Sequence, residues 1–254
     1  MQLARRVAVE AGDMVHEGRR GGVMSSVAKS SPTDIVTEFD RASERMIVER
    51  LHQCRPDDSI VGEEGASTTG SSGITWLIDP IDGTTNFVYD LGGWAVSIAA
   101  HDAEGPLAAA VYAPTSGELF SAVRGGGATR NDVPIRCGHL DDLSTALVAT
   151  GFSYSPHRRR EQAARLTLMM AHIRDIRRFG AASVDLCNVA MGRVDVYFEE
   201  GLGPWDLAGG QLVATEAGCV VGDFTGGPAR PEQVLVANPA LFRAAAELIA
   251  SASR

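Results

Sequence analysis

Apolar positions recur at helical spacing along several stretches of the chain. Leu3, Val7 and Ala11 lie three or four residues apart and predict a first amphipathic helix that ends near Gly18. Similar patterns predict further helices over residues 37–51, 160–173, 182–191, 205–217 and 241–250.

Short apolar runs between these helices predict β-strands. They cover residues 59–62, 76–79, 95–100, 107–113, 119–123, 146–150, 194–198 and 234–237. Asn131 and Asp132 are typical of a hairpin turn, and the small polar residues 66–73 predict a mobile surface loop.

Strands outnumber helices in the first half of the chain, and the two alternate in the second half. This order predicts an α+β fold, built as a layered sandwich around buried sheets. We expect a junction near Leu140 that separates an N-terminal half, residues 1–140, from a C-terminal half, residues 141–254.

The amino-acid composition shows that acidic residues outnumber basic ones. The 254 residues carry a formal net charge of -9, which disfavours nucleic acid as a partner. One basic run, 158–160, is followed by Arg174, Arg177 and Arg178. This region predicts a solvated helix face or, alternatively, a local patch for an anion or a partner protein.

The four cysteines form no C-x-x-C pair and match no zinc-binding spacing, so a reducing cytoplasm is the expected location. We find no signal-type apolar core at the N-terminus, and no run approaches the roughly 20 apolar residues of a membrane helix.

Acidic residues stand beside turn residues at four places: 34–40, 63–64, 79–82 and 205–206. The third is the most informative, because a strand delivers Asp79 into a turn that Pro80 stiffens and that ends at Asp82. Two ionised carboxylates this close call for a cation, and hard oxygen ligands suit Mg²⁺, Mn²⁺ or Ca²⁺.

The residues after Asp82 add a way to hold phosphate. Gly83 lets the backbone approach a ligand closely, and the N–H groups of Gly83 and Thr84 suit a phosphate group. Metal ligands beside a phosphate cradle are the parts that phosphoryl transfer requires. Taken alone, each piece has a simpler explanation: a D-x-x-D turn, a solvated Glu63-Glu64 pair, or Asp206 as a helix cap.

The complete motifs are more specific. WLIDPIDGTTNF, residues 76–87, and WDLAGGQLVATEAG, residues 205–218, resemble the two signatures of the inositol monophosphatase family. KSSPTDIVTEFD, residues 29–40, and VGEE, residues 61–64, resemble two further blocks of that family in the same order. RRFGAASVDLC, residues 177–187, is similar to bacterial members, especially actinobacterial ones.

This resemblance implies an αβαβα sandwich of the inositol monophosphatase and fructose-1,6-bisphosphatase type, and a phosphatase with two to three Mg²⁺ ions. The first ion would be held by Glu63, Asp79 and the Ile81 carbonyl. The second would be held by Asp79, Asp82 and Asp206, and Glu63 would hold a weaker third ion. The resemblance also implies that Mn²⁺ can substitute, that Li⁺ inhibits, and that the protein is a homodimer.

The resemblance further assigns the other parts of the site. Thr84, bonded to Asp40, would activate a water molecule together with Glu63, while the amides of Gly83 and Thr84 would hold the phosphate. The alcohol of the substrate would contact the following residues: Asp82, Gly180, Ala181, Ala182 and Glu199.

The substrate that the resemblance favours is inositol monophosphate. Histidinol phosphate, fructose 1,6-bisphosphate, NADP and phosphoadenosine phosphate remain alternatives on the same fold, although Thr85, where some of those enzymes carry lysine, favours the inositol type. A non-catalytic partner of the transcription machinery is an alternative of another class. Two positions depart from the family pattern: Cys219 replaces a usual glycine, and Gly203-Pro204 precedes Trp205.

Overall fold

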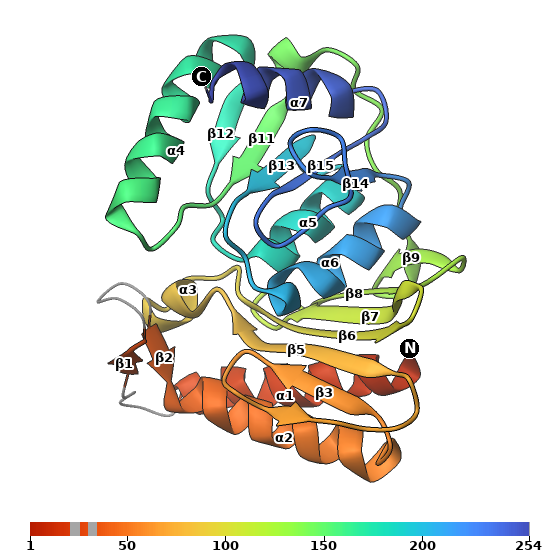
Figure 1. Cartoon of the computed structure of the whole chain (residues 1–254). Coiled ribbons are helices and arrows are strands. Elements are labelled where there is room, and N and C mark those ends of the chain that lie inside the picture. The colour runs from red at the N-terminus through yellow and green to blue at the C-terminus, as the bar shows by residue number, and fades with distance from the viewer. Residues whose placement is uncertain (21–25, 30–34, 254) are drawn as a thin grey trace.

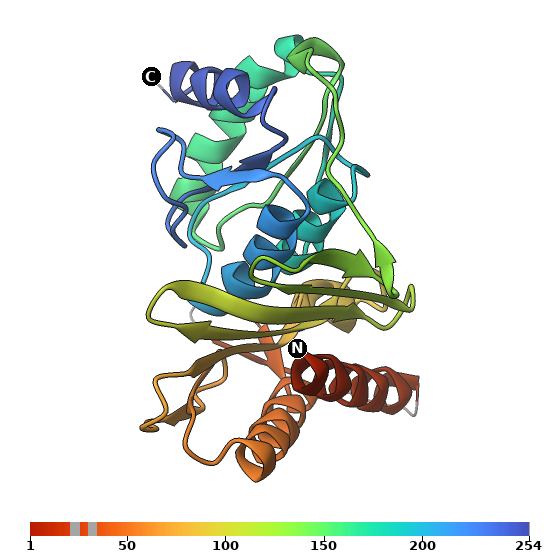
Figure 2. The same cartoon turned by 90° about the vertical axis from the view of Figure 1, so that its right-hand side faces the viewer.

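Helical layers and β-sheets alternate through the molecule. The computed structural model describes residues 1–20, 26–29 and 35–253. Figures 1 and 2 show two sheets with helices on both outer faces and between them. The predicted αβαβα sandwich is therefore confirmed.

The larger sheet has eight strands. Their bounds are β3 (Ser59–Gly62), β4 (Ser67–Thr68), β5 (Thr75–Asp82), β6 (Ala95–Asp102), β7 (Gly105–Ala113), β8 (Glu118–Val123), β9 (Gly127–Arg130) and β10 (Val133–Pro134). Their spatial order is β10-β9-β8-β7-β6-β5-β3-β4, and only β3 and β5 pair in parallel. The helices α1 (Gln2–Arg20) and α2 (Glu38–Cys54) cover its outer face.

Strand β6 shows why both faces of this sheet are covered. Val96 and Ile98 enter the core beneath α1 and α2, whereas Ala95 and Ala99 enter the core on the opposite side. Because successive side chains of a strand point to opposite faces, an apolar run without polar alternation places one set in each core.

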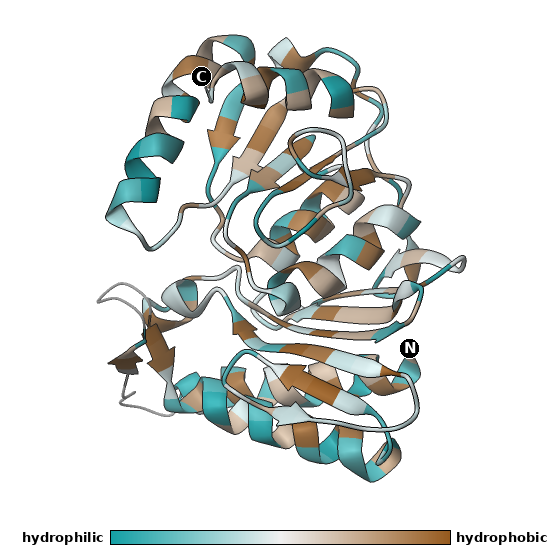
Figure 3. Ribbon diagram, viewed as in Figure 1, coloured by the Kyte–Doolittle hydropathy of each residue, from teal (hydrophilic) through white to brown (hydrophobic). Residues whose placement is uncertain are grey.

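The smaller sheet has five strands. They are β11 (Leu147–Thr150), β12 (Asp175–Arg177), β13 (Val196–Glu199), β14 (Val220–Gly222) and β15 (Val234–Ala237), in the order β12-β11-β13-β15-β14. The helices α5 (Ala182–Ala190) and α6 (Pro204–Glu216) lie between the two sheets, and α4 (Pro156–Met169) and α7 (Phe242–Ser251) lie outside the smaller one. Figure 3 shows the polar outer faces of α2 and α4.

The remaining elements are short. They are β1 (Ser26–Ala28), β2 (Ile35–Thr37), α3 (Thr84–Val88) and the 3-10 turns Leu143–Thr145 and Met170–His172. None of the helices in the described ranges combines the length and the apolar character that crossing a membrane requires.

Several boundaries differ from the sequence prediction. The strand expected to end at Asp79 continues through Pro80 to Asp82, and the loop predicted over 66–73 contains β4, which pairs with β3. The helix predicted over 160–173 begins earlier, at Pro156, whose fixed φ suits the first helical turn. The edge strands β12 and β14 were not predicted, because three residues are too few to show a period.

The turn at Asn131 and Asp132 is confirmed, since both residues have the positive φ, 49° and 66°, that a two-residue hairpin loop requires. The division at residue 140 stays a prediction. One continuous core joins Phe120 of the larger sheet, Leu212 of α6 and Val236 of the smaller sheet.

Candidate functional site

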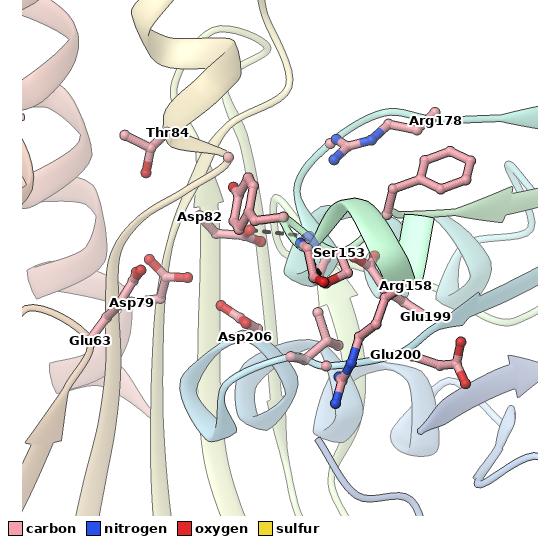
Figure 4. Close-up of a pocket in the computed structure, with 18 of the residues that line it drawn as sticks. Glu63, Asp79, Asp82, Thr84, Ser153, Arg158, Arg178, Glu199, Glu200 and Asp206 are labelled. Atoms are coloured by element: carbon pink, nitrogen blue, oxygen red, sulfur yellow. Dashed lines mark hydrogen bonds between the residues drawn. The ribbon is translucent and has the colours of Figure 1, made fainter. Parts of the chain in front are cut away.

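A cavity of about 440 Å³ is lined by residues of both sheets, from β5 and from β13. Its walls come from Glu63 and from four segments: residues 79–84, 152–158, 178–182 and 199–206. Figure 4 shows the carboxylates of Glu63 and Asp79 on the same side of the cavity as Asp206, with arginine and glutamate side chains on the other side. The site is therefore assembled from segments far apart in the sequence.

A bulge in β5 aims two carboxylates into this cavity. Asp79 pairs opposite Ser97 and Asp82 opposite Ala95, so three steps along β5 match two steps along β6. In a regular strand, residues three apart point to opposite faces. The extra residue at the bulge brings the side chains of Asp79 and Asp82 to the same side, where both line the cavity.

Three carboxylates, of Glu63, Asp79 and Asp206, offer ligand atoms that all lie within 4.8 Å of one another. Glu63 follows β3, Asp79 lies in β5, and Asp206 is in the first turn of α6, where it accepts a hydrogen bond from the Gly203 N–H at 2.6 Å. This three-acid group consists of three of the predicted metal ligands, although Asp206 is remote from the other two in sequence.

The protonation of these acids reflects their crowding. Burial and the charge of Glu63 raise the pKa of Asp79 well above its usual range, and burial raises the pKa of Asp206 to about 7. Among the described residues, Lys29 offsets part of this charge, with Nζ 2.9 Å from Glu63 and in contact with Glu64. A partly buried set of oxygen donors with excess negative charge fits a divalent cation of the Mg²⁺ or Ca²⁺ kind.

Asp82 lies beside this group but is held by α5. Its Oδ1 accepts from the Ala182 N–H at 3.1 Å, and its Oδ2 accepts from the Ser183 N–H at 2.6 Å and the Ser183 hydroxyl at 2.5 Å. Burial and the charge of Asp206 raise its pKa to about 7. The structure thus brings Asp82 into the cavity without including it in the three-acid group.

Thr84 lies at the start of α3 and connects the cavity to a buried acid. Its Oγ1 is 3.1 Å from Asp40 Oδ1 and 3.1 Å from the Ile81 carbonyl oxygen. The single hydroxyl proton can serve only one of these acceptors at a time. Asp40 is fully buried on α2, where Thr37 donates to its other oxygen from N–H at 2.7 Å, and burial raises its pKa.

Two neighbours of Asp40 on α2 were not predicted. Glu44 accepts hydrogen bonds from the N–H groups of Glu64, at 2.8 Å, and Ala66, at 2.9 Å, and so fixes the turn after Glu63. The Ser43 hydroxyl donates to the Pro80 carbonyl at 3.2 Å. Residues 40, 43 and 44 share one helix face, so a buried polar stripe was the available signal.

The alcohol side of the cavity is formed partly as predicted. Gly180, Ala182 and Glu199 line the cavity, whereas Ala181 is buried just beneath it. Gly83, with φ of 92°, packs so closely that a Cβ atom there would lie 3.1 Å from Ala181 Cβ. A larger residue at position 83 would push the two walls apart.

Glu199 is the last residue of β13, and a hydrogen bond fixes its carboxylate. Its Oε2 accepts a hydrogen bond from the Tyr197 hydroxyl at 2.7 Å, and burial raises its pKa to about 7. Gly151 leaves the space for this carboxylate, because a Cβ atom there would lie 2.0 Å from Glu199 Oε1.

Several lining residues were missed or interpreted otherwise. Ser153 and Phe152 line the cavity from the loop before α4 and were not predicted. Arg158 and Arg178, interpreted as a solvated face or an anion or partner patch, also line it. The Asp34 part of the 29–40 motif lies outside the described residues.

Comparisons with known proteins agree with this geometry. The model of the inositol monophosphatase family matches residues 1–254. An inositol-1-monophosphatase of Mycobacterium leprae is 47% identical over 203 residues, covering 76% of this chain and 70% of that protein. A protein of Pasteurella multocida called Nus factor SuhB is 42% identical over 231 residues, covering 89% of this chain and 86% of that one.

A solved structure, the extragenic suppressor protein suhB of Bartonella henselae, superposes with a TM-score of 0.93 at 32% identity. The match covers 98% of this chain and 97% of that one.

Proposed function

The chain belongs to the inositol monophosphatase family and is a phosphatase, and we propose that it hydrolyses inositol monophosphate to inositol and phosphate with the help of Mg²⁺. The observation that carries this proposal is the group formed by Glu63, Asp79 and Asp206 at one end of a cavity. The other end of the cavity presents Glu199, which can accept hydrogen bonds from the hydroxyl groups of a polyol.

The proposed metal ligands are Glu63, Asp79, the Ile81 carbonyl, Asp82 and Asp206. Bound there, Mg²⁺ would neutralise phosphate charge, lower the pKa of water and stabilise the departing oxygen. Mn²⁺ is expected to substitute for Mg²⁺, and Li⁺ to inhibit.

The side chains of the protein would then accept the proton that the attacking water loses. Thr84 can accept that proton on Oγ1 while its own proton passes to Asp40, 3.1 Å away. The raised pKa of Asp40 makes this buried carboxylate a better proton acceptor than an exposed one. Glu63 would orient the same water from the opposite side.

The backbone would hold the phosphate. We assign the N–H groups of Gly83 and Thr84 to two phosphate oxygens, since they open α3 at the cavity wall. Asp82, Glu199 and the backbone at residues 180–182 would orient the alcohol so that water attacks phosphorus in line with the leaving oxygen.

A panel of phosphate monoesters tests this proposal. Phosphate release is measured with and without Mg²⁺ from inositol 1-phosphate, histidinol phosphate, fructose 1,6-bisphosphate, NADP and phosphoadenosine phosphate. A Mg²⁺-dependent preference for inositol 1-phosphate supports the proposed substrate. A preference for another compound keeps the mechanism and replaces the substrate.

A second candidate function is a non-catalytic one. It is favoured by the relatives called Nus factor SuhB and by the exposed arginines of α4. Capture of transcription proteins from a cytoplasmic extract by both wild type and Asp82→Asn would support this role. We further propose a cytoplasmic homodimer, which light scattering of the purified protein would test.

A further inference from the structure

Two cysteines that the proposed reaction does not use lie side by side. Cys137 belongs to the segment between β10 and β11, and Cys219 follows the end of α6. Both are free thiols buried in the core that the two sheets share. The thiol of Cys219 lies against that of Cys137, close enough for a hydrogen bond between them. The fold thus pairs two thiols that are far apart in the sequence.

Backbone contacts hold the two segments together at this point. The Cys137 N–H donates to the Ala217 carbonyl at 3.0 Å, and the Cys219 N–H donates to the Ala214 carbonyl at 3.0 Å. A Cβ atom at Gly218 would lie 3.8 Å from Cys137 Sγ, which is ordinary van der Waals contact. Cys137 Sγ therefore faces the turn that carries Cys219, and the two thiols can react without a rearrangement of the fold.

The two thiols differ in their access to small molecules. Cys137 lines a cavity of about 370 Å³ bordered by residues 136–139, 217–218 and 238–240, whereas Cys219 is not part of its wall. Burial and the neighbouring Cys137 thiol raise the pKa of Cys219, so this thiol stays protonated at neutral pH. A small oxidant that enters the cavity therefore meets Cys137 first.

We propose that Cys137 and Cys219 form a reversible disulfide when the protein meets hydrogen peroxide. Cys137 Sγ attacks one peroxide oxygen, the O–O bond breaks, and Cys137 sulfenic acid and one water molecule form. Cys219 Sγ then attacks the sulfenic sulfur, so that an S–S bond replaces the S–O bond and a second water molecule leaves with the Cys219 proton. Two thiols are oxidised and one peroxide is reduced to two waters, and a dithiol reductant reverses the bond by exchange.

This bond would fasten the segment between the two sheets to the end of α6, whose first turn carries Asp206. It would also close a long loop of the chain, which restricts the unfolded state and stabilises the fold. Disulfides of reducing compartments are usually transient and respond to oxidants, as a reversible bond does. Cys219 is one of the positions that depart from the family pattern, so the pair is a feature of this chain.

The test uses Cys54→Ser, which removes the exposed thiol and leaves the three buried ones, Cys137, Cys187 and Cys219. The folded protein is treated with hydrogen peroxide, and free thiols are counted in denaturant before and after. We expect two of the three thiols to disappear, peptide mapping to join Cys137 to Cys219, and dithiothreitol to restore all three. The melting temperature of the oxidised protein should be at least about 3 °C higher.

Three variants of Cys54→Ser provide the controls, and their melting temperatures before oxidation show that they fold. Cys137→Ala and Cys219→Gly should form no disulfide within the chain and should show no rise in melting temperature. Cys187→Ala removes a fully buried neighbouring thiol and should still form the bond. Retention of all three thiols in Cys54→Ser, a bond that involves Cys187, or oxidation of Cys137 to a sulfinic acid without a bond would overturn the inference. An unchanged melting temperature after the bond has formed would overturn its stabilising role.

Discussion

Asp82 and Ser183 lie 101 residues apart in the chain and are joined by two hydrogen bonds. The N–H and the hydroxyl of Ser183 both donate to Asp82 Oδ2, at 2.6 and 2.5 Å. This contact ties β5 of the larger sheet to the first turn of α5. The orientation of a proposed metal ligand therefore depends on a helix that is remote from it in the sequence.

Replacing the Ser183 hydroxyl should weaken metal binding. In Ser183→Ala, Asp82 loses one of its three donors, and a hydrogen bond to a charged group contributes about 1.5–3 kcal/mol. We expect the Mg²⁺ concentration for half-maximal turnover to rise about tenfold. Ser97→Ala is the matched control, because it removes a buried hydroxyl that has no hydrogen-bond partner among the described residues. Equal Mg²⁺ requirements in both variants would contradict this role of Ser183.

Neutralising single carboxylates should separate activity from folding. Asp79→Asn, Asp82→Asn and Asp206→Asn each remove a negative charge from a crowded site in which Asp79 and Asp82 are buried and Asp206 is half-buried. We expect turnover to fall by about a thousandfold or more, which corresponds to roughly 4 kcal/mol of lost transition-state stabilisation. The metal-free melting temperature should stay near or above that of wild type, since repulsion is relieved. Circular dichroism melts without Mg²⁺ provide the check, and unfolding of all three variants would instead make these acids structural.

The affinity for Mg²⁺ should increase as the pH rises through 7. The pKa values of Asp82 and Asp206 are raised to about 7, so below that pH each group holds a proton that the metal has to displace. Each displaced proton weakens binding up to tenfold per pH unit below the pKa. Calorimetry at about pH 6 and pH 8 measures this change. The slope should be smaller in Asp206→Asn, and identical slopes would contradict the assignment.

Local motifs made much of this site predictable. The run from Trp76 to Thr84 predicts a strand, a stiff turn and oxygen donors. Its resemblance to a family signature further predicts that Asp206 lies at the same site. The bulge that aligns Asp79 with Asp82 depends on pairing with β6, so the strand itself shows no sign of it.

Contacts between remote segments were harder to predict. Ser183 donates hydrogen bonds to Asp82, and Glu44 accepts one from the turn after Glu63. These contacts form only when the sheets and helices pack together. Arg158 was interpreted as part of a solvated face or, alternatively, of an anion or partner patch, and only the fold reveals that the first turn of its helix borders the cavity.

The position of Glu199 can be tested without changing Glu199 itself. Gly151 is buried at the end of β11, and a Cβ atom there would lie 2.0–2.1 Å from the Glu199 carboxyl atoms. In Gly151→Ala the carboxylate has to swing away, which is cheap for the flexible end of a side chain. The melting temperature should therefore change by only a few degrees, about 1 kcal/mol. The KM for inositol 1-phosphate should rise about tenfold, as expected when one hydrogen bond to a charged group is lost. Glu199→Gln, which keeps the shape and removes the charge, should raise KM similarly and reduce the dependence of KM on pH near 7, because burial raises the pKa of Glu199 to about 7. A normal KM in Gly151→Ala would show that the alcohol does not require the carboxylate at this place.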